Sequence, residues 1–338
     1  MVDTDEPVLR VGVIGMGFLG KVTGRELGRT ERGELAAITD ISDENLQAAA
    51  EEFDVPEENQ YADYEEMIAN ENLDAIAVTT PHGLHAEQLL TGLDNGLHVL
   101  CEKPLCTNLE DAYEIVERTE RSDRTVMLGY QRHLASAFIE AREYWHEDGR
   151  ESPDFVTAEV TQDWIDAVEG SWKADPDLSG GGQLYDTGSH LVDSVLWMTG
   201  LTPTSVSADM IFHDEAERVD TQATLTVQFE EDAVASIAVS GDAPRVDEHI
   251  RIWGEDGATC IDGREWNPRR YREIDREGTI VDPNVSPGSV QPKTEAFIES
   301  IREGTEPPAT VYDGLYATAL TEAAYEAAWT GERVDIDL

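Results

Sequence analysis

The sequence predicts two domains, an α/β domain built on a parallel sheet and an α+β domain with a largely antiparallel sheet. From residue 8 to about residue 131, short apolar segments alternate with amphipathic segments. Such alternation is typical of a parallel sheet with right-handed helical crossovers. After about residue 150, strand patterns follow one another, several of them alternating apolar and polar residues, as in an antiparallel sheet with one covered face. We therefore expect a first domain over residues 1–131 and a second over residues 132–338.

The elements of the first domain are expected in a regular order. An opening strand over residues 8–14 ends at Gly15, and a helix then runs to about residue 29. A second strand covers residues 34–40, and Ser42 is of the residue type that caps the next helix. Three more strands are expected, at residues 73–80, 97–101 and 125–131.

The second domain is expected to contain longer strands interrupted by helices. Strand patterns occur at residues 155–164, 221–229, 234–240 and 249–253, and helical patterns at 183–199, 293–303 and 312–330. The stretch 264–288 is irregular and carries five arginines. It predicts a surface loop, with a substrate lip or a subunit contact as the alternative.

The charge balance limits the partners of this chain. The sequence has 24 basic and 71 acidic residues, a net charge of −47, and only four lysines. Such a surface disfavours nucleic acids and anionic membranes. An excess of acids with scarce lysine resembles proteins of salt-accumulating halophilic archaea, and molar salt screens such repulsion by shortening the Debye length to ~3 Å. We expect the protein to require high salt.

Cysteine usage and hydropathy point to a cytoplasmic protein. Three cysteines do not form a disulfide framework for a chain of this length. The first ten residues lack a basic start followed by an apolar stretch, and no segment approaches the ~18 apolar residues that a membrane span needs.

A glycine-rich turn follows the first expected strand. Its residues are Gly15-Met16-Gly17-Phe18-Leu19-Gly20. Gly15 permits the tight turn, Gly17 lets the backbone approach a pyrophosphate, and Gly20 allows close packing of helix on strand. The order of strand, turn, helix, strand and acid predicts a Rossmann dinucleotide site.

Asp40 lies twenty residues past Gly20, at the end of the second expected strand. A carboxylate there accepts hydrogen bonds from a ribose 2′-hydroxyl and repels a 2′-phosphate. Because the next residues, Ile41 and Ser42, include no arginine, we expect NAD in preference to NADP. The alternative is that Asp40 only caps a helix.

Two further segments end strands at the carboxyl edge of the expected sheet, where ligands bind. The first contains Thr80, Pro81, His82 and His85; either histidine is a candidate to contact cofactor or substrate, and helix capping is the alternative. A metal pair is not expected. The second is Cys101-Glu102-Lys103-Pro104. Lysine, unlike arginine, has a movable proton when buried, so Lys103 suggests proton chemistry, or else a surface lysine retained by chance.

The order of these motifs, together with Gly180-Gly181-Gly182 and the segment from Gln183 to His190, resembles the Gfo/Idh/MocA family of oxidoreductases. The resemblance spans nearly the whole chain. It implies that Lys103, Asp186 and His190 line the substrate pocket beside the nicotinamide, with Glu102 in the cofactor-binding turn. It also implies a homodimer or homotetramer formed through the antiparallel sheet.

The residue chemistry agrees with those roles. Asp186 and His190 are four residues apart in an expected helix and would share a face. Oxidation of a secondary alcohol needs a base, and imidazole, with an ordinary pKa of ~6.5, suits that role. Lys103 would bond the reacting oxygen or join the proton relay, so which of Lys103 and His190 accepts the proton stays open. An ordinary exposed helix pair is the alternative, although three glycines let backbone approach a ligand or another chain.

Other candidates are weaker. Tyr130 and Arg132 follow the sixth expected strand, and Trp164, Trp172 and Lys173 precede the glycine run; these side chains could bind a sugar, or be core tryptophans and a surface lysine. The sequence thus predicts an NAD-dependent dehydrogenase acting on a sugar, sugar acid or cyclic polyol. An NAD-assisted glycoside hydrolase and a non-catalytic dinucleotide-binding sensor are the alternatives.

Overall fold

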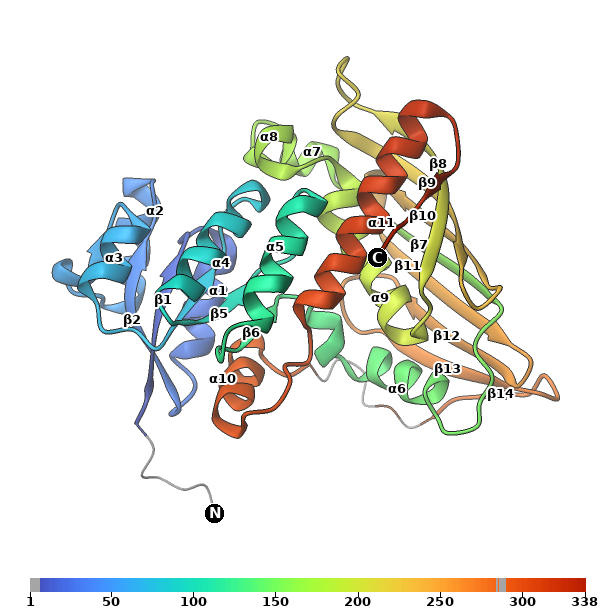
Figure 1. Ribbon diagram of the computed structural model, residues 1–338, viewed down its shortest axis with the longest axis horizontal. Helices are drawn as coiled ribbons and strands as arrows, with labels where there is room; N and C mark the ends of the chain where they lie inside the picture. Colours follow the sequence, from blue (N-terminus) through green and yellow to red (C-terminus); the bar gives the residue numbers. More distant parts are fainter. Residues whose placement is uncertain (1–6, 284, 286–289) are drawn as a thin grey trace. The chain divides into compact units, whose positions relative to one another are not determined.

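The chain forms two compact units in a computed structural model that describes residues 7–283, 285 and 290–338 (Figure 1). The first unit contains the residues up to Cys106, Glu110–Gly129 and Gln291–Val311. The second contains Thr107–Leu109, Tyr130–Val290 and Tyr312–Leu338. No helix in the described part of the chain is both long and apolar enough to cross a membrane.

A six-stranded parallel sheet forms the centre of the first unit, in the order β3-β2-β1-β4-β5-β6. Its strands are β1 (Leu9–Ile14), β2 (Gly33–Thr39), β3 (Gln60–Tyr61), β4 (Ala75–Val78), β5 (His98–Cys101) and β6 (Val126–Leu128). All four residues of β4 are buried, as expected for a strand covered on both faces. The strand order reverses between β1 and β4, and ligands bind at the carboxyl ends of strands beside such a reversal. The predicted Rossmann domain is confirmed.

Helices surround this sheet, as Figure 1 shows. They are α1 (Phe18–Leu27), α2 (Asp43–Phe53), α3 (Tyr64–Asn70), α4 (His85–Asp94), α5 (Leu109–Glu120) and α10 (Lys293–Glu303). Ser42 caps α2 as expected, since its side chain accepts the Asn45 N–H at 3.3 Å.

One segment of the expected second domain belongs instead to the first unit. Helix α10 packs against α1 and β5, and its Phe297 and Ile298 are buried. The Leu128 N–H donates to the Ala309 carbonyl at 3.0 Å. Residues 132–338 are therefore not one continuous domain, because the apolar face of α10 is buried in the unit that also contains the Rossmann sheet.

The second unit contains a nine-stranded sheet in the order β14-β13-β12-β11-β7-β10-β9-β8-β15. All neighbours are antiparallel except β7 and β10, so the predicted mostly antiparallel sheet is confirmed. Its strands are β7 (Phe155–Asp163), β8 (Pro203–Phe212), β9 (Asp220–Phe229), β10 (Val234–Ser240), β11 (Asp242–Gly254), β12 (Gly257–Gly263), β13 (Arg270–Asp275), β14 (Ile280–Val281) and β15 (Val334–Asp335).

Helices cover one face of this sheet (Figure 1). The larger ones are α6 (Ser136–Trp145), α9 (Ser189–Thr199) and α11 (Val311–Thr330), and the short ones are α7 (Ile165–Val168) and α8 (Pro176–Ser179). In β9, the buried side chains of Ala223, Leu225 and Val227 alternate with exposed ones. This alternation places the apolar half of each strand on the covered face.

The stretch expected as an irregular loop, 264–288, is partly regular. It contributes β14 at the edge of the sheet and β13 beside it, and Tyr271 of β13 is buried. Residues 284 and 286–288 lie outside the described residues. Arg270 and Arg272 obscured the strand pattern because they lie on the polar positions of β13. Both pair with acids, as Arg270 does with Asp282 at 2.9 Å.

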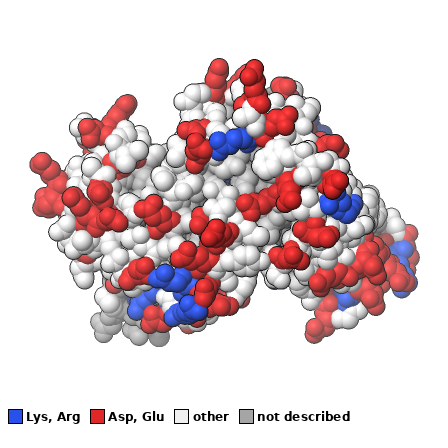
Figure 2. All heavy atoms as spheres, turned by 45° about the horizontal axis from the view of Figure 1, so that its top comes forward, with Lys and Arg blue, Asp and Glu red and all other residues white. Residues whose placement is uncertain are grey.

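The acidic residues are dispersed over the surface, as the composition suggested. Figure 2 shows Asp and Glu side chains across the visible face, with Lys and Arg in a few small groups. Several arginines lie beside carboxylates, for example Arg25 with Glu52 at 2.7 Å. Most of the acidic excess has no such cationic neighbour to balance it, because 71 acids face 24 bases.

Candidate active site

The glycine turn has the local geometry of a pyrophosphate site. Gly15 has φ +90°, and a Cβ on Gly20 would lie 2.0 Å from the Gly15 carbonyl oxygen. By contrast, a Cβ on Gly17 would meet no described atom within 4 Å. Gly15 and Gly20 are thus required by the turn itself, whereas Gly17 leaves open backbone at the start of α1, where helix N–H groups bind phosphates. These residues fit a dinucleotide.

Asp40 connects the glycine turn to α2. Its Oδ2 accepts the Met16 N–H at 2.7 Å, and its Oδ1 accepts the Ser42 N–H at 2.8 Å. Ser42 is itself the N-cap of α2. Asp40 bonds both to this cap and to the glycine turn, so its contacts extend beyond the helix end. Nearby, Phe18 in the turn is 80% exposed, a further surface for a ligand, and Leu19 is half-buried.

The turn after β4 is fixed to the glycine turn. Thr79 Oγ1 donates to the Gly15 carbonyl at 2.5 Å, and Thr80 Oγ1 donates to Gln88 on α4 at 2.6 Å. Pro81 then precedes a 3₁₀ turn that contains the buried His82. The expected edge of the cofactor site is therefore assembled from the first unit alone.

His85, a candidate cofactor contact, lies at the start of α4. The residue is fully buried. Its Nδ1 lies 2.7 Å from the Pro104 carbonyl and its Nε2 lies 2.9 Å from the Thr80 carbonyl. Both ring nitrogens are engaged with backbone. The sequence placed His85 at the correct sheet edge but could not show that its side chain points inward.

The turn after β5 carries Glu102 and Lys103. Glu102 forms a buried ion pair with Lys293 of α10, and a Cβ on Gly129 would lie 2.6 Å from its carboxylate. The Glu102 carboxylate therefore binds Lys293, a partner that the sequence did not indicate, and its expected place in the cofactor-binding turn stays a prediction. Lys103 is 9% exposed and precedes a cis peptide bond to Pro104.

Asp186 lies in the second unit, on a π-helix over Leu184–Gly188 that leads into α9. Its Oδ2 accepts from Trp164 Nε1 at 2.8 Å and pairs with Lys173 Nζ at 2.6 Å. The carboxylate is 8% exposed, and the ammonium-bearing side chain is 36% exposed. Asp186 is thus a held, largely buried carboxylate, and the alternative of an ordinary exposed residue does not apply. The π-turn also weakens the four-residue spacing argument, which assumed an α-helix.

His190 is the second residue of α9, and Arg132 binds its backbone carbonyl. Arg132 Nη1 donates to the His190 carbonyl at 3.0 Å and to Ser194 Oγ at 3.2 Å. Arg132 also pairs with the fully buried Glu248, which binds Arg269 as well. Burial lowers the pKa of Arg132, and Glu248 opposes that shift. Arg132 thus belongs to a buried network, and its expected contact with substrate stays a prediction.

Aromatic and acidic residues support the same helix. The Tyr130 ring is edge-on to His190 at 6.1 Å between centroids and stacks on His133 at 6.0 Å. His133 Nε2 lies 3.0 Å from Asp193, whose pKa burial raises to about 6. With Asp313 these residues offer three ligand atoms within 4.8 Å of one another. Within this cluster, His133 and Asp193 are in direct contact and form a buried pair. The pair joins the 3₁₀ turn that contains His133 to helix α9, which contains Asp193.

The three consecutive glycines have a packing role that sequence reasoning missed. A Cβ on Gly181 would lie 2.2 Å from Tyr325 Oη, and one on Gly182 would lie 2.0 Å from the Asp220 carbonyl oxygen. The side chain of Asp220 accepts the Gly182 N–H at 3.1 Å and the Leu184 N–H at 3.0 Å. The glycines therefore admit the chain's own side chains and backbone. No local pattern could have identified Asp220, which lies 38 residues beyond Gly182.

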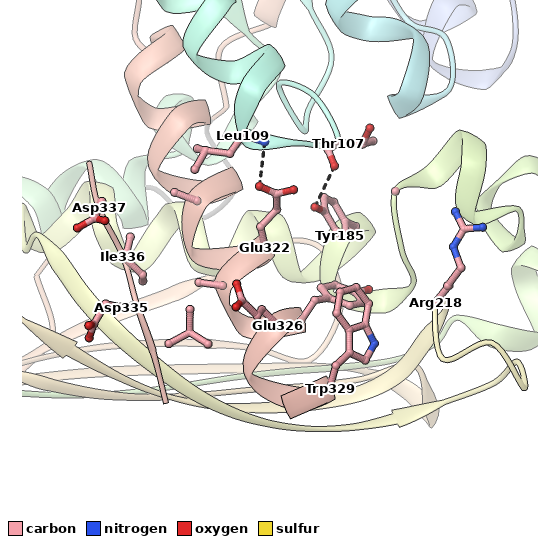
Figure 3. Close-up of a pocket in the computed structure, with 15 residues that line it drawn as sticks. Thr107, Leu109, Tyr185, Arg218, Glu322, Glu326, Trp329, Asp335, Ile336 and Asp337 are labelled. Atoms are coloured by element: carbon pink, nitrogen blue, oxygen red, sulfur yellow. Dashed lines mark hydrogen bonds between the residues drawn. The ribbon is translucent and has the colours of Figure 1, made fainter. Parts of the chain in front are cut away.

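A cavity of about 610 Å³ lies elsewhere in the second unit. Figure 3 shows its walls, which include Trp329 and Glu326 of α11 and residues of the C-terminal strand. Glu322 accepts the Leu109 N–H there at 2.9 Å. Asp186 and His190 are not among the lining residues, so this cavity is not the candidate reaction site. Lys103 belongs to the first unit, and Asp186, His190 and Trp172 belong to the second.

Known proteins resemble this chain over nearly its whole length. Residues 9–130 match the model of the GFO_IDH_MocA oxidoreductase family, NAD-binding Rossmann fold, and residues 141–259 match the GFO/IDH/MocA C-terminal domain. An NADP(+) D-xylose 1-dehydrogenase from Haloarcula marismortui is 26% identical over 345 residues, covering 99% of this chain and 94% of that protein. A myo-inositol 2-dehydrogenase from Thermotoga maritima is 27% identical over 341 residues, covering 94% and 95%.

A solved structure supports the fold. The aldose–aldose oxidoreductase from Caulobacter crescentus, complexed with glycerol, superposes with a TM-score of 0.85 at 24% identity, covering 98% of this chain and 100% of that one. Both family models, the relatives and the superposition span the two units described above. The chain belongs to the Gfo/Idh/MocA family of oxidoreductases.

Proposed function

We propose that this protein is an NAD-dependent dehydrogenase that transfers a hydride between nicotinamide and a secondary alcohol carbon of a sugar, sugar acid or cyclic polyol. The observation that carries the proposal is the arrangement at the carboxyl edge of the six-stranded sheet. There Gly17 leaves backbone open for a dinucleotide, and the buried Lys103 follows strand β5 of the same sheet. When bound, the nicotinamide supplies the hydride acceptor. The relatives from Haloarcula and Thermotoga are named for D-xylose and myo-inositol, which are substrates of this chemical class.

We propose NAD as the preferred cofactor because of Asp40. Its carboxylate, bonded to the Met16 N–H at 2.7 Å, lies where a ribose 2′-hydroxyl is recognised in this fold and where a 2′-phosphate would be repelled. Two haloarchaeal xylose dehydrogenase relatives carry NADP(+) in their names, so both cofactors must be compared. A strong preference for NADP would refute this role of Asp40.

We assign proton transfer, substrate orientation and charge stabilisation to different site residues. We assign His190 to accept the hydroxyl proton, because imidazole is the side chain suited to proton transfer near neutral pH. Asp186, held by Trp164 and Lys173, would orient the substrate hydroxyl groups. Lys103 would donate a hydrogen bond to the reacting oxygen and stabilise its developing negative charge. Arg132 and Tyr130 position His190.

The test is NADH formation with a panel of aldoses, sugar acids and inositols in molar KCl. Lys103→Met and His190→Ala should each reduce turnover by about 10²–10⁴, the usual worth of a positioned acid or base, while NADH binding persists. Wild-type turnover in both variants would refute the assignment. Release of product from a glycoside without net NADH would favour the hydrolase, and binding of dinucleotide with no turnover would favour the sensor.

We also propose that the protein is a homodimer or homotetramer, as the family resemblance implies. The nine-stranded sheet has one helix-covered face, and its other face carries exposed apolar residues such as Phe155 and Trp253. Light scattering in molar KCl measures the mass directly. A monomer at micromolar concentration would contradict this expectation.

A further inference from the structure

We propose that His85 is the positioning residue of Lys103, because its buried imidazole joins the turn after β4 to the turn that carries this lysine. The inference rests on the proposed function only for the chemistry assigned to Lys103. All the residues that carry it belong to the first unit.

The imidazole of His85 spans the two turns. The residue is fully buried at the start of α4. Its Nδ1 lies 2.7 Å from the carbonyl oxygen of Pro104, the residue directly after Lys103, and its Nε2 lies 2.9 Å from the carbonyl oxygen of Thr80. A single side chain thus contacts the backbone of both turns that follow the adjacent strands β4 and β5.

Backbone contacts hold the residues on either side of Lys103. Before the lysine, the Glu102 N–H donates to the Val78 carbonyl at 2.9 Å. After it, Pro104 has no N–H to donate, so its carbonyl is the only polar backbone group by which that residue can be held. His85 binds this carbonyl. Loss of the contact therefore removes a support of the turn directly after Lys103.

The other end of the imidazole is fixed to the glycine turn. Gln88, one helical turn after His85, accepts from Thr80 Oγ1 at 2.6 Å, so α4 holds Thr80 at two points. The preceding Thr79 donates to the Gly15 carbonyl at 2.5 Å. These hydrogen bonds connect the Lys103 turn to the glycine turn proposed to bind the dinucleotide. They fix the position of Lys103 relative to that turn, and a displacement of about 1 Å in a catalytic group costs on the order of 10²-fold in rate.

The two contacts also define informative substitutions. Carbonyl oxygens only accept, so a neutral ring can donate to one of the two carbonyls and only a protonated ring can donate to both. Burial lowers the pKa of His85, while the two carbonyls and Glu102 favour the protonated ring, and Lys103 opposes it; the His82 ring lies 5.7 Å away. Asn and Gln each carry one amide nitrogen on a shorter or more flexible stem. Either can donate to one carbonyl but cannot span both.

The experiment uses the small number of lysines. Protein labelled with [ε-13C]lysine should give four side-chain signals, one for each lysine in the sequence, assigned by single Lys→Arg variants. In folded His85→Gln, we expect the Lys103 signal to move or broaden while the signals of Lys21 and Lys173 stay unchanged. The matched control is His98→Gln, at the opposite end of β5, which should leave Lys103 unchanged.

An unchanged Lys103 signal in both His85→Gln and His85→Asn would overturn the proposal. If neither variant folds, hydrogen exchange in the wild-type protein decides: a ring N–H of His85 protected from exchange supports the contact, and complete lack of protection overturns it. Neither readout needs a substrate, so a failure of the proposed function and a failure of this inference are distinguishable.

Turnover provides a second arm once a substrate is known. His85→Gln should reduce kcat by about 10-fold or more and change NADH affinity by less than about 3-fold. In a Lys103→Met background the same substitution should have no further effect on kcat, because residues that act through one another are not additive. Losses that multiply would show a role independent of Lys103 and would overturn the proposal.

Discussion

Asp220 provides the sharpest link between the second unit's stability and its candidate site. The residue begins β9 and is fully buried. It accepts the N–H groups of Gly182 and Leu184 at 3.1 and 3.0 Å and a hydrogen bond from the Tyr325 hydroxyl. Burial raises the pKa of Asp220 to about 6, against these hydrogen bonds, which lower it. Asp220 thus holds the segment that leads to Asp186, and it does so at a cost that depends on pH.

The size and sign of that dependence follow from the two pKa values. Between the ordinary value of 3.8 and the folded value of about 6, the folded protein keeps the Asp220 proton and the unfolded chain has lost it. Stability therefore falls as pH rises through this window. At about 1.4 kcal/mol per pKa unit, the loss is about 3 kcal/mol between about pH 4 and pH 7. Asp220→Asn cannot ionise, and its amide oxygen still accepts the two backbone N–H groups.

The assay is urea unfolding of wild type and Asp220→Asn at several pH values in molar KCl. The two proteins should be similarly stable near pH 4, and the variant should become more stable than wild type by about 3 kcal/mol near pH 7. Asp193, whose pKa burial also raises to about 6, is present in both proteins, so its contribution cancels in the difference. Parallel stability curves would refute the reasoning.

Three further predictions concern the first unit and the surface. Gly17→Ala should leave the unfolding midpoint unchanged and weaken dinucleotide binding by about tenfold or more, as measured by NADH fluorescence. Gly20→Ala should destabilise the fold by about 1–3 kcal/mol, because its Cβ would lie 2.0 Å from a backbone oxygen. Equal effects of the two variants on stability would contradict this. Lys293→Met should cost about 3–5 kcal/mol in urea unfolding because it leaves Glu102 buried without its cation, and Glu102→Gln in the same chain should recover part of the loss; no recovery would argue against the pair. Lowering KCl from molar to about 0.05 M should lower the thermal midpoint because the net charge of −47 is then less screened; a midpoint independent of salt would remove the halophilic interpretation.

Much of the fold could be predicted because its signals are local. Continuous apolar runs such as Ala75–Val78 and alternating ones such as Asp220–Phe229 identify buried and half-buried strands. The assignment of α10 to the first unit could not be predicted. Its helical pattern was evident, but an apolar helix face does not specify which sheet covers it. The pair that reveals its place, Glu102 with Lys293, joins residues 191 positions apart.

The short-range features of the candidate site could also be predicted from the sequence, and its long-range contacts could not. The spacing of the glycines and Asp40 is short-range, and the structure places them together. The contacts of His85 with backbone carbonyls and of Arg132 with Glu248 were not expected, because a strand end fixes where a residue lies and not which way its side chain points. The glycine run was noticed for the correct reason, close approach, but the approaching groups are Tyr325 and Asp220. Asp220 itself had no signal in the sequence.

Most of the four lysines lie beside carboxylates. Lys173 pairs with Asp186 at 2.6 Å, Lys293 pairs with Glu102, and Lys103 directly follows Glu102. Three of the four thus lie at or beside carboxylates of the candidate site, in a chain whose other 20 basic residues are arginine (24 less four). Lysine is a compact point charge with three donors, whereas the planar guanidinium of arginine binds carboxylates through a rigid fork, as Arg132 and Arg269 do at the buried Glu248. The two residue types are therefore not interchangeable, and the lysines beside Asp186 and Glu102 mark positions where a point charge is used in a chain that otherwise uses arginine.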